Sequence, residues 1–263
     1  MRLSVNCMVR NDEATIFESL VSAGRVADQV VVFDTGSTDK TLEAVEAAMK
    51  ELDKPFFLNV LEDIPDLSTF SYKGGSFLPS YKLADVRNQM VKISDGDWIW
   101  VVDADEVYTD CDADFIRGWV DRTDKEAGFV PLVWMCWDGS HIIRTADPPV
   151  YFHSGRLFKK NGSHGLVQCK GHFPGESYFR GKHQIVGGDP SSEVLRLPNG
   201  GYRHYECVTK PFRRRILSHT PFNNPKPEAL DRRPHYANWM EIPKLPIPGP
   251  SHELNNPPAH MRI

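Results

Sequence analysis

The residues best suited to chemistry lie where one apolar segment ends. Residues 98–102 are apolar, and Asp103, Asp105 and Glu106 follow within four positions. The apolar segment has the length and the aromatic, β-branched content of a strand buried on both faces. Crowded carboxylates repel one another, and a hard divalent cation such as Mg²⁺ or Mn²⁺ relieves that repulsion. Asp103 and Asp105 are therefore candidate metal ligands, and the alternative is a solvated acidic turn behind a core strand.

Polar clusters also follow two earlier apolar segments. Asp34 and Gly36 come directly after Val30 to Phe33, and residues 10–12 come after the segment 3–9. An Asp at a strand end can accept the imide N–H of a pyrimidine or a ribose hydroxyl, and Gly36 would let a ligand approach the backbone closely. The next helix would add a partial positive charge at its N-terminus. The alternative is a capping turn without a ligand, and Asn11 or Asp12 is expected to cap the first helix.

Alternating strand and helix patterns place these clusters together. Apolar segments at 3–9, 30–33, 56–61 and 98–102 alternate with helical stripes between Ile16 and Ala23, between Leu42 and Leu52, and between Leu83 and Ile93. This alternation predicts an α/β fold, a mostly parallel sheet with helices on both faces. A helix over 110–123 and a hairpin from Gly128 to Arg144 should follow. The carboxyl ends of parallel strands share one edge, so that edge is the expected site.

Composition sets wider bounds. The 263 residues are 40% apolar and 25% charged with a net charge of -4, which is ordinary for a soluble globular protein and unlike a protein that coats nucleic acid. No apolar run approaches the roughly 20 residues of a membrane span. Five cysteines without a Cys-x-x-Cys pair suit a reducing compartment. Since the first residues run directly into a strand pattern, we expect no signal peptide and a cytoplasmic location.

Four segments, in this order and spacing, resemble the donor-binding half of the family 2 glycosyltransferases with the GT-A fold, in particular bacterial or phage members. They are Val5–Asn11, Val30–Thr41, Leu83–Asn88 and Trp98–Glu106. The resemblance is close over residues 1–106 and fainter to about residue 215. It implies a Rossmann-like GT-A sheet, with a nucleotide-sugar half at 1–106 and an acceptor and catalytic half at 107–219. Residues 220–263 are rich in proline, which prevents long regular elements, and form an expected C-terminal arm.

The resemblance implies roles for the strand-end residues. Asp34 would hold the nucleoside, with Arg10 and Gly36 also on the donor, while Arg87 and Asn88 would lie near its diphosphate. Asp103 would approach the ribose or the metal, and Asp105 would ligate Mn²⁺ or Mg²⁺. The implied reaction is inverting transfer of a sugar from a nucleotide-diphosphate donor, a UDP-sugar, to a hydroxyl acceptor such as a glycan or a lipopolysaccharide core. A cation and an arginine suit it, because charge develops on the leaving diphosphate.

The second half of the chain matches less closely. Arg156 opens an Arg-Leu-Phe-Lys segment like one in the family, and relatives then carry adjacent His and Glu. Here His172 and Glu176 are separated, so Glu176 is the first candidate for the base that deprotonates the acceptor and His172 the second. His204 resembles a late family histidine that completes the metal shell or contacts the diphosphate. Arg213, in a run of three arginines, would close over the diphosphate or contact an anionic acceptor, unless that run is a solvated face.

Other interpretations remain open. Cys169, His172, His204 and Cys207 have a spacing that could hold a structural Zn²⁺. The acceptor could instead be a hydroxymethylated base in DNA, with basic residues contacting phosphates. The chain could also be a relative that binds nucleotide sugars or glycans without turnover. A sugar nucleotidyltransferase is disfavoured, because residues 9–12 lack the Gly-rich loop of that class.

Overall fold

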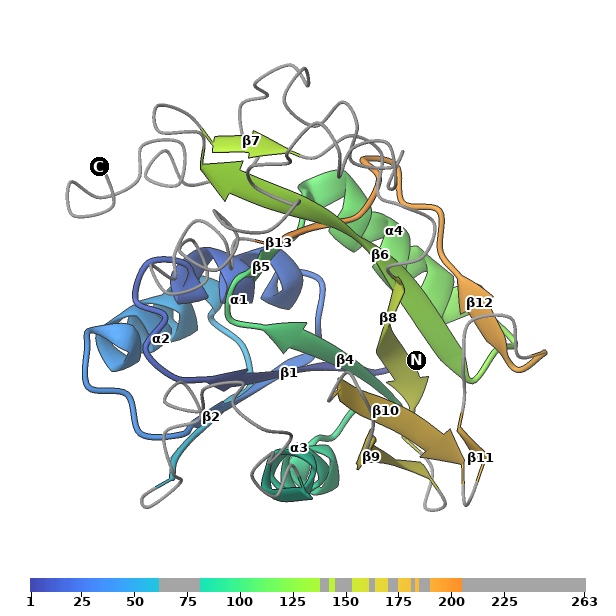
Figure 1. Cartoon of the computed structure of the whole chain (residues 1–263), viewed down its shortest axis with the longest axis horizontal. Coiled ribbons are helices and arrows are strands. Elements are labelled where there is room, and N and C mark those ends of the chain that lie inside the picture. The colour runs from blue at the N-terminus through green and yellow to red at the C-terminus, as the bar shows by residue number, and fades with distance from the viewer. Residues whose placement is uncertain are drawn as a thin grey trace, which may run out of the picture.

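A computed structural model describes four parallel strands at the centre of the molecule. They are β1 (Leu3–Val9), β2 (Gln29–Asp34), β3 (Phe56–Val60) and β4 (Trp98–Asp103), in the order β3-β2-β1-β4 (Figure 1). The structure describes residues 1–61, 81–137, 142–144, 153–160, 164–169, 175–180, 183–184 and 190–204. The predicted parallel α/β core is confirmed.

Beyond β4 the sheet becomes mixed. Strand β8 (His153–Lys159) pairs antiparallel with both β4 and β6 (Ala127–Trp137). Strands β12 (Ser192–Val194) and β13 (Tyr202–His204) run parallel to β6, and β5 (Glu106–Val107) pairs antiparallel with β13, within a sheet of ten strands. Strand β7 (Ile142–Arg144) pairs antiparallel with β6, so the predicted hairpin is confirmed.

Helices cover both faces of this sheet, as predicted. On one face lie α1 (Ile16–Gly24), α2 (Thr41–Leu52) and α4 (Asp110–Arg122), and on the other lies α3 (Tyr81–Ile93) (Figure 1). The amphipathic stripe of α3 explains its place, because Val86 and Met90 pack against Val31 and Phe33 of β2. No helix in the described part of the chain is both long and apolar enough to cross a membrane.

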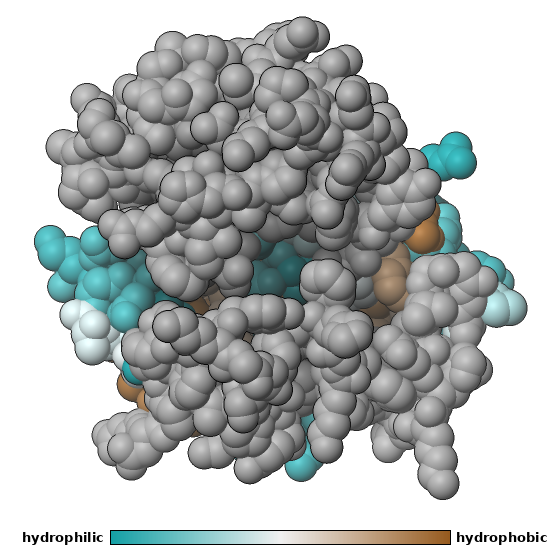
Figure 2. Space-filling view, viewed as in Figure 1, coloured by the Kyte–Doolittle hydropathy of each residue, from teal (hydrophilic) through white to brown (hydrophobic). Residues whose placement is uncertain are grey.

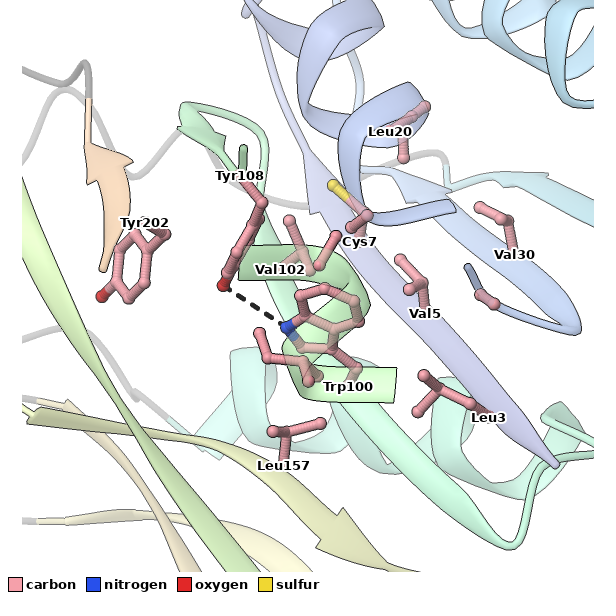
Figure 3. Packing of buried hydrophobic residues seen from close by; sticks show 14 of the residues in the cluster. Leu3, Val5, Cys7, Leu20, Val30, Trp100, Val102, Tyr108, Leu157 and Tyr202 are labelled. Carbon is pink, nitrogen blue, oxygen red and sulfur yellow. Dashed lines mark hydrogen bonds between the residues drawn. The ribbon is translucent and has the colours of Figure 1, made fainter. Parts of the chain in front are cut away.

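The apolar run of β4 is buried because alternate residues enter two different cores. Trp98, Trp100 and Val102 pack in the cluster under α1 and α4, whereas Ile99 and Val101 pack with the other face of the sheet. In the first cluster, the indole N–H of Trp100 donates to the hydroxyl of Tyr108 over 3.3 Å (Figure 3). This rigid strand positions the acidic residues that follow it.

A small antiparallel sheet lies beside α3. Its strands are β9 (His164–Cys169), β10 (Gly175–Arg180) and β11 (His183–Gln184), in the order β11-β10-β9 (Figure 1). On the face shown in Figure 2, hydrophilic described residues lie at the centre of the view.

Candidate active site

The ends of β1, β2 and β4 meet at one edge of the sheet. Because these strands are parallel and in register, Val9 lies opposite Asp34 and Met8 lies opposite Asp103. The N–H of Thr35 donates to the carbonyl of Val9 over 2.9 Å and holds the first two ends together. The shared edge predicted from the strand pattern is confirmed.

Asp34 is fully buried and shapes the loop that follows β2. Its Oδ1 accepts the backbone N–H groups of Gly36 and Ser37, each over 2.9 Å. Gly36 has a φ of +98°, a conformation that L side chains rarely adopt, which explains the glycine. Asp34 Oδ2 has no hydrogen-bond partner within the described residues. A buried carboxylate oxygen in that state is a natural acceptor for a ligand N–H or O–H.

Arg10 lies against the same loop. A Cβ placed on Gly36 would come within 3.8 Å of the Arg10 guanidinium carbon. The structure therefore brings together Arg10, Asp34 and Gly36, three residues predicted from sequence to bind the donor.

The loop after β1 is bonded to the loop after β2. Asn11 has a φ of +52°, and its Oδ1 accepts the N–H of Thr38 over 2.7 Å. The N–H of Asn11 donates to the hydroxyl of Ser37 over 2.9 Å. The two loops therefore form one unit in which Arg10 and Asp34 are fixed relative to each other.

These bonds correct the predicted cap of α1. The N-cap is Thr15, without a side-chain capping bond, rather than Asn11 or Asp12. The side chain of Asn11 instead accepts from the loop after β2, and the backbone N–H of Asp12 donates to the hydroxyl of Thr41, the first residue of α2, over 2.9 Å.

Asp103 is held by two arginines. Strand β4 ends at Asp103, and Ala104 and Asp105 form a turn. The side chains of Asp103 and Asp105 are therefore not placed on one face of a continuous strand. Asp103 Oδ1 accepts from Arg87 Nη2 of α3 over 2.5 Å, and Oδ2 accepts from Arg156 Nη2 of β8 over 2.7 Å. Burial raises the pKa of Asp103, but the charges of Arg156 and Arg87 outweigh it and hold the pKa well below its usual range. The carboxylate stays ionised with its side chain 33% exposed.

Glu106 turns inward from the same segment. It is fully buried, its Oε1 accepts from Arg156 Nη2, and its Oε2 accepts the N–H of Asp103 over 3.2 Å. Burial raises the pKa of Glu106 well above its usual value, while the Arg156 charge opposes that shift. Sequence reasoning assigned no role to Glu106 and took Arg156 only as part of a family-like segment. One signal in the sequence could have indicated this role. Glu106 is a third carboxylate directly after Asp103 and Asp105, and a carboxylate buried there needs a basic partner.

Asp105 faces His204. The Asp105 Oδ1 lies 3.5 Å from His204 Nε2, and the two side chains are 5% and 14% exposed. The pairing of β13 with β5, which places His204 opposite Glu106, brings the histidine to the acidic turn. Within the described residues, no group of three or more His, Cys, Asp or Glu side chains could hold a metal. A carboxylate and an imidazole nevertheless suit a cation whose remaining ligands are water and phosphate oxygens.

The structure describes some of the other predicted site residues and not the rest. Arg87 is buried on α3 and Asn88 follows it. Glu176 lies on β10 and Cys169 at the end of β9. His172, Cys207, Arg213 and the arm at 220–263 lie outside the described residues, so the predicted zinc site and the predicted base remain predictions.

Comparison with known proteins gives only distant likenesses. No protein-family model matches the chain, and no curated protein matches it. TarS of S. aureus has a TM-score of 0.48 at 16% identity, covering 91% of this chain and 43% of TarS. TarS 1-349 in complex with UDP has a TM-score of 0.40 at 21% identity, covering 57% of this chain and 40% of that one.

A third solved structure is glucosyl-3-phosphoglycerate synthase from M. tuberculosis with Mn²⁺, UDP-glucose and phosphoglyceric acid. Its TM-score is 0.33 at 18% identity, over 51% of this chain and 43% of that one. The chain spans less than half the length of each of these three solved chains, and all three TM-scores are below 0.5.

Proposed function

We propose that the chain is a metal-dependent glycosyltransferase of the GT-A type. It would transfer a sugar from a UDP-linked donor to a hydroxyl acceptor such as a glycan or a lipopolysaccharide core, with inversion. One observation carries the proposal: a single sheet edge holds a buried aspartate with an open oxygen and, beyond β1, an acidic turn with arginines and a histidine. The first suits a nucleoside and the second suits a diphosphate with a cation.

The loop after β2 is the proposed nucleoside site. Asp34 Oδ2 would accept the imide N–H of uracil, because the other oxygen is already used by the loop itself. Gly36 presents backbone without a side chain, and the guanidinium of Arg10 beside it supplies positive charge toward the phosphates. The loop is held in place before any ligand arrives, which lowers the cost of binding.

The acidic turn is the proposed diphosphate and metal site. Asp105 and His204 would hold Mn²⁺ or Mg²⁺, and the bound cation would stabilise the charge that develops on the leaving diphosphate. Arg87 would lie beside that diphosphate, with Asn88 next to it. The ionised Asp103 has lone pairs beyond its two arginine bonds, which would serve a ribose hydroxyl or the metal.

Deprotonation of the acceptor is assigned by sequence alone. An inverting transfer needs a base near the attacking hydroxyl, and Glu176 on β10 is the proposed group, with His172 as the alternative. Arg213 would close over the diphosphate. No observation on the described residues favours a DNA base as acceptor.

The proposal is tested by turnover. The chain is incubated with UDP-glucose, UDP-galactose or UDP-N-acetylglucosamine and a panel of glycan and lipopolysaccharide-core acceptors, with and without Mn²⁺, and released UDP is measured. We expect release with at least one donor only when Mn²⁺ is present, and its loss in Asp105→Asn. Asp110→Asn on α4 is the matched control, because Asp110 is exposed and pairs with Arg25. Full activity of Asp105→Asn, or no release with any donor and any hydroxyl acceptor, would contradict the proposal.

A further inference from the structure

The three carboxylates at the end of β4 have separate partners. Asp103 contacts Arg87 and Arg156, Asp105 faces His204, and Glu106 is bound inside the protein. Because Glu106 is fully buried and both of its oxygens are engaged, it does not share a cation with Asp105. The third carboxylate therefore needs another explanation.

Arg156 connects two of these carboxylates. Its Nη2 contacts Asp103 Oδ2 at 2.7 Å and also Glu106 Oε1, so one atom on β8 joins the residues on either side of the turn. Glu106 closes the same turn from within, by accepting the N–H of Asp103 over 3.2 Å. With Arg87, the cluster sets two guanidinium groups against two carboxyl groups. Without Arg156, Asp103 and Glu106 lose the donor that joins them across the turn.

The same pair reaches the strand that carries His204. The guanidinium of Arg156 lies 5.5 Å from the centre of the Tyr202 ring, a cation–π contact. Tyr202 is on β13, two residues before His204, and His204 pairs through its backbone with Glu106. Figure 3 shows Tyr202 beside Tyr108 at this core boundary. Arg156 and Glu106 thus contact both segments that must meet for Asp105 to face His204.

We infer that Glu106 and Arg156 are positioning residues of the metal site. They hold the turn at 103–105 and strand β13 so that Asp105 and His204 converge before a cation binds. This inference rests on the proposed function of the edge. It assigns neither residue to the metal or to the substrate.

The inference predicts a selective defect. Partners that orient metal ligands typically contribute about 10-fold to 100-fold to metal affinity. Glu106→Gln keeps the shape of the side chain but has only one oxygen, so it cannot accept from both Arg156 and the N–H of Asp103. Arg156→Lys keeps a charge but replaces a planar fork with a single ammonium group, which suits the two carboxylates less well. Both variants should weaken Mn²⁺-dependent UDP binding by about 10-fold or more, and should leave metal-free uridine binding at the Asp34 loop unchanged.

The experiment compares wild type, Glu106→Gln, Arg156→Lys and the control Arg117→Lys. Arg117 pairs with Asp28 at 2.6 Å at the opposite ends of the strands, so Arg117→Lys makes the same change of guanidinium to ammonium in an ion pair away from the site. Calorimetry measures UDP affinity over a Mn²⁺ titration and uridine affinity without metal, and paramagnetic resonance measures bound Mn²⁺ directly. We expect a raised Mn²⁺ requirement in the first two variants and none in Arg117→Lys.

Three negative results can be told apart. If wild type binds UDP with Mn²⁺ and folded Glu106→Gln and Arg156→Lys bind it equally well, the positioning role is overturned and the proposed function stands. If wild type binds no nucleotide with any metal, the proposed function fails and the inference fails with it. If Arg117→Lys weakens Mn²⁺-dependent binding as much as the site variants, the effect is general destabilisation and the inference is also overturned.

Discussion

Two strands of this sheet end in an aspartate, and the two aspartates are stabilised in opposite ways. Asp34 is bound by backbone N–H groups two and three positions further on. Asp103 is bound by arginines 16 and 53 positions away, on α3 and β8. The first site is made by its own loop and leaves Asp34 Oδ2 without a hydrogen-bond partner among the described residues, whereas the second is made by distant elements that engage both oxygens of Asp103. The same local pattern, a buried strand followed by Asp, thus gives one carboxylate bound by its own loop and one bound by two arginines.

The largest expected effect is on stability at the end of β4. Arg156→Met leaves Glu106 buried without its counter-charge, and breaking such a pair typically costs about 3 to 5 kcal/mol of unfolding free energy. Asp34→Asn keeps a carbonyl for the loop N–H groups and should cost less. Urea unfolding of both variants measures which of them loses more unfolding free energy. The double variant Arg156→Met/Glu106→Leu should recover much of the loss, and an equal loss in Arg156→Met and Asp34→Asn would break the comparison.

The next effect concerns nucleobase choice at the end of β2. Asp34→Asn can keep its oxygen on the N–H groups of Gly36 and Ser37 and so present an N–H where the wild type presents Oδ2. Uracil offers a donor at this position of its ring and cytosine an acceptor. We therefore expect UDP affinity to fall about tenfold, roughly 1.4 kcal/mol, and the preference to move toward CDP. Calorimetry with both nucleotides measures the ratio, and Asp103→Asn, the control, should leave it unchanged.

A smaller effect tests the bond between the first two loops. Asn11→Gly tolerates the φ of +52° but removes the acceptor for the N–H of Thr38, so it should lose about 1 kcal/mol of stability. Asn11→Ala should lose a further 1 to 2 kcal/mol, roughly, because alanine is strained in that conformation. Asn11→Asp keeps both the tolerance of a positive φ and the acceptor oxygen, so it should stay close to wild type in stability. If the three variants are equally stable in urea, the two loops are not held together by this residue.

The smallest effect appears only in acid. Because the folded pKa of Asp103 is lowered, its ionisation adds stability that is fully present above the pKa of an unfolded aspartate, about 3.9. That stability is lost as the pH falls toward the lower folded value. Wild type should therefore lose unfolding free energy below about pH 4 more steeply than Asp103→Asn. Urea titrations between pH 2 and pH 6 measure both slopes, and parallel curves would show that the arginines do not stabilise this carboxylate.

Much of the fold could be predicted because burial leaves a local pattern. Residues 98–102 of β4 are all apolar since Trp100 and Ile99 enter different cores, and α3 shows its stripe since Val86 and Met90 face β2. The cap of α1 was predicted wrongly: the helix begins after Thr15, and the side chain of Asn11 bonds to the loop after β2 instead. Local pattern alone does not show such competition.

The candidate site was predictable to the extent that it is local. The Asp34 loop and the acidic turn follow their strands directly, so their shared edge followed from parallel topology. The roles of Arg156 and Glu106 depend on β8 inserting antiparallel between β4 and β6 and on β13 pairing with β5. Those pairings join segments far apart in the chain, and no short spacing indicates them.

The most direct test of the account is UDP affinity as a function of Mn²⁺ in wild type and Asp105→Ala. In wild type we expect Mn²⁺ to strengthen UDP binding, because the cation would join the diphosphate to Asp105 and His204. In Asp105→Ala we expect the metal-dependent gain to vanish while weak metal-free binding at the Asp34 loop remains. UDP binding that is equally strengthened by Mn²⁺ in both proteins, or no nucleotide binding in either, would contradict the account.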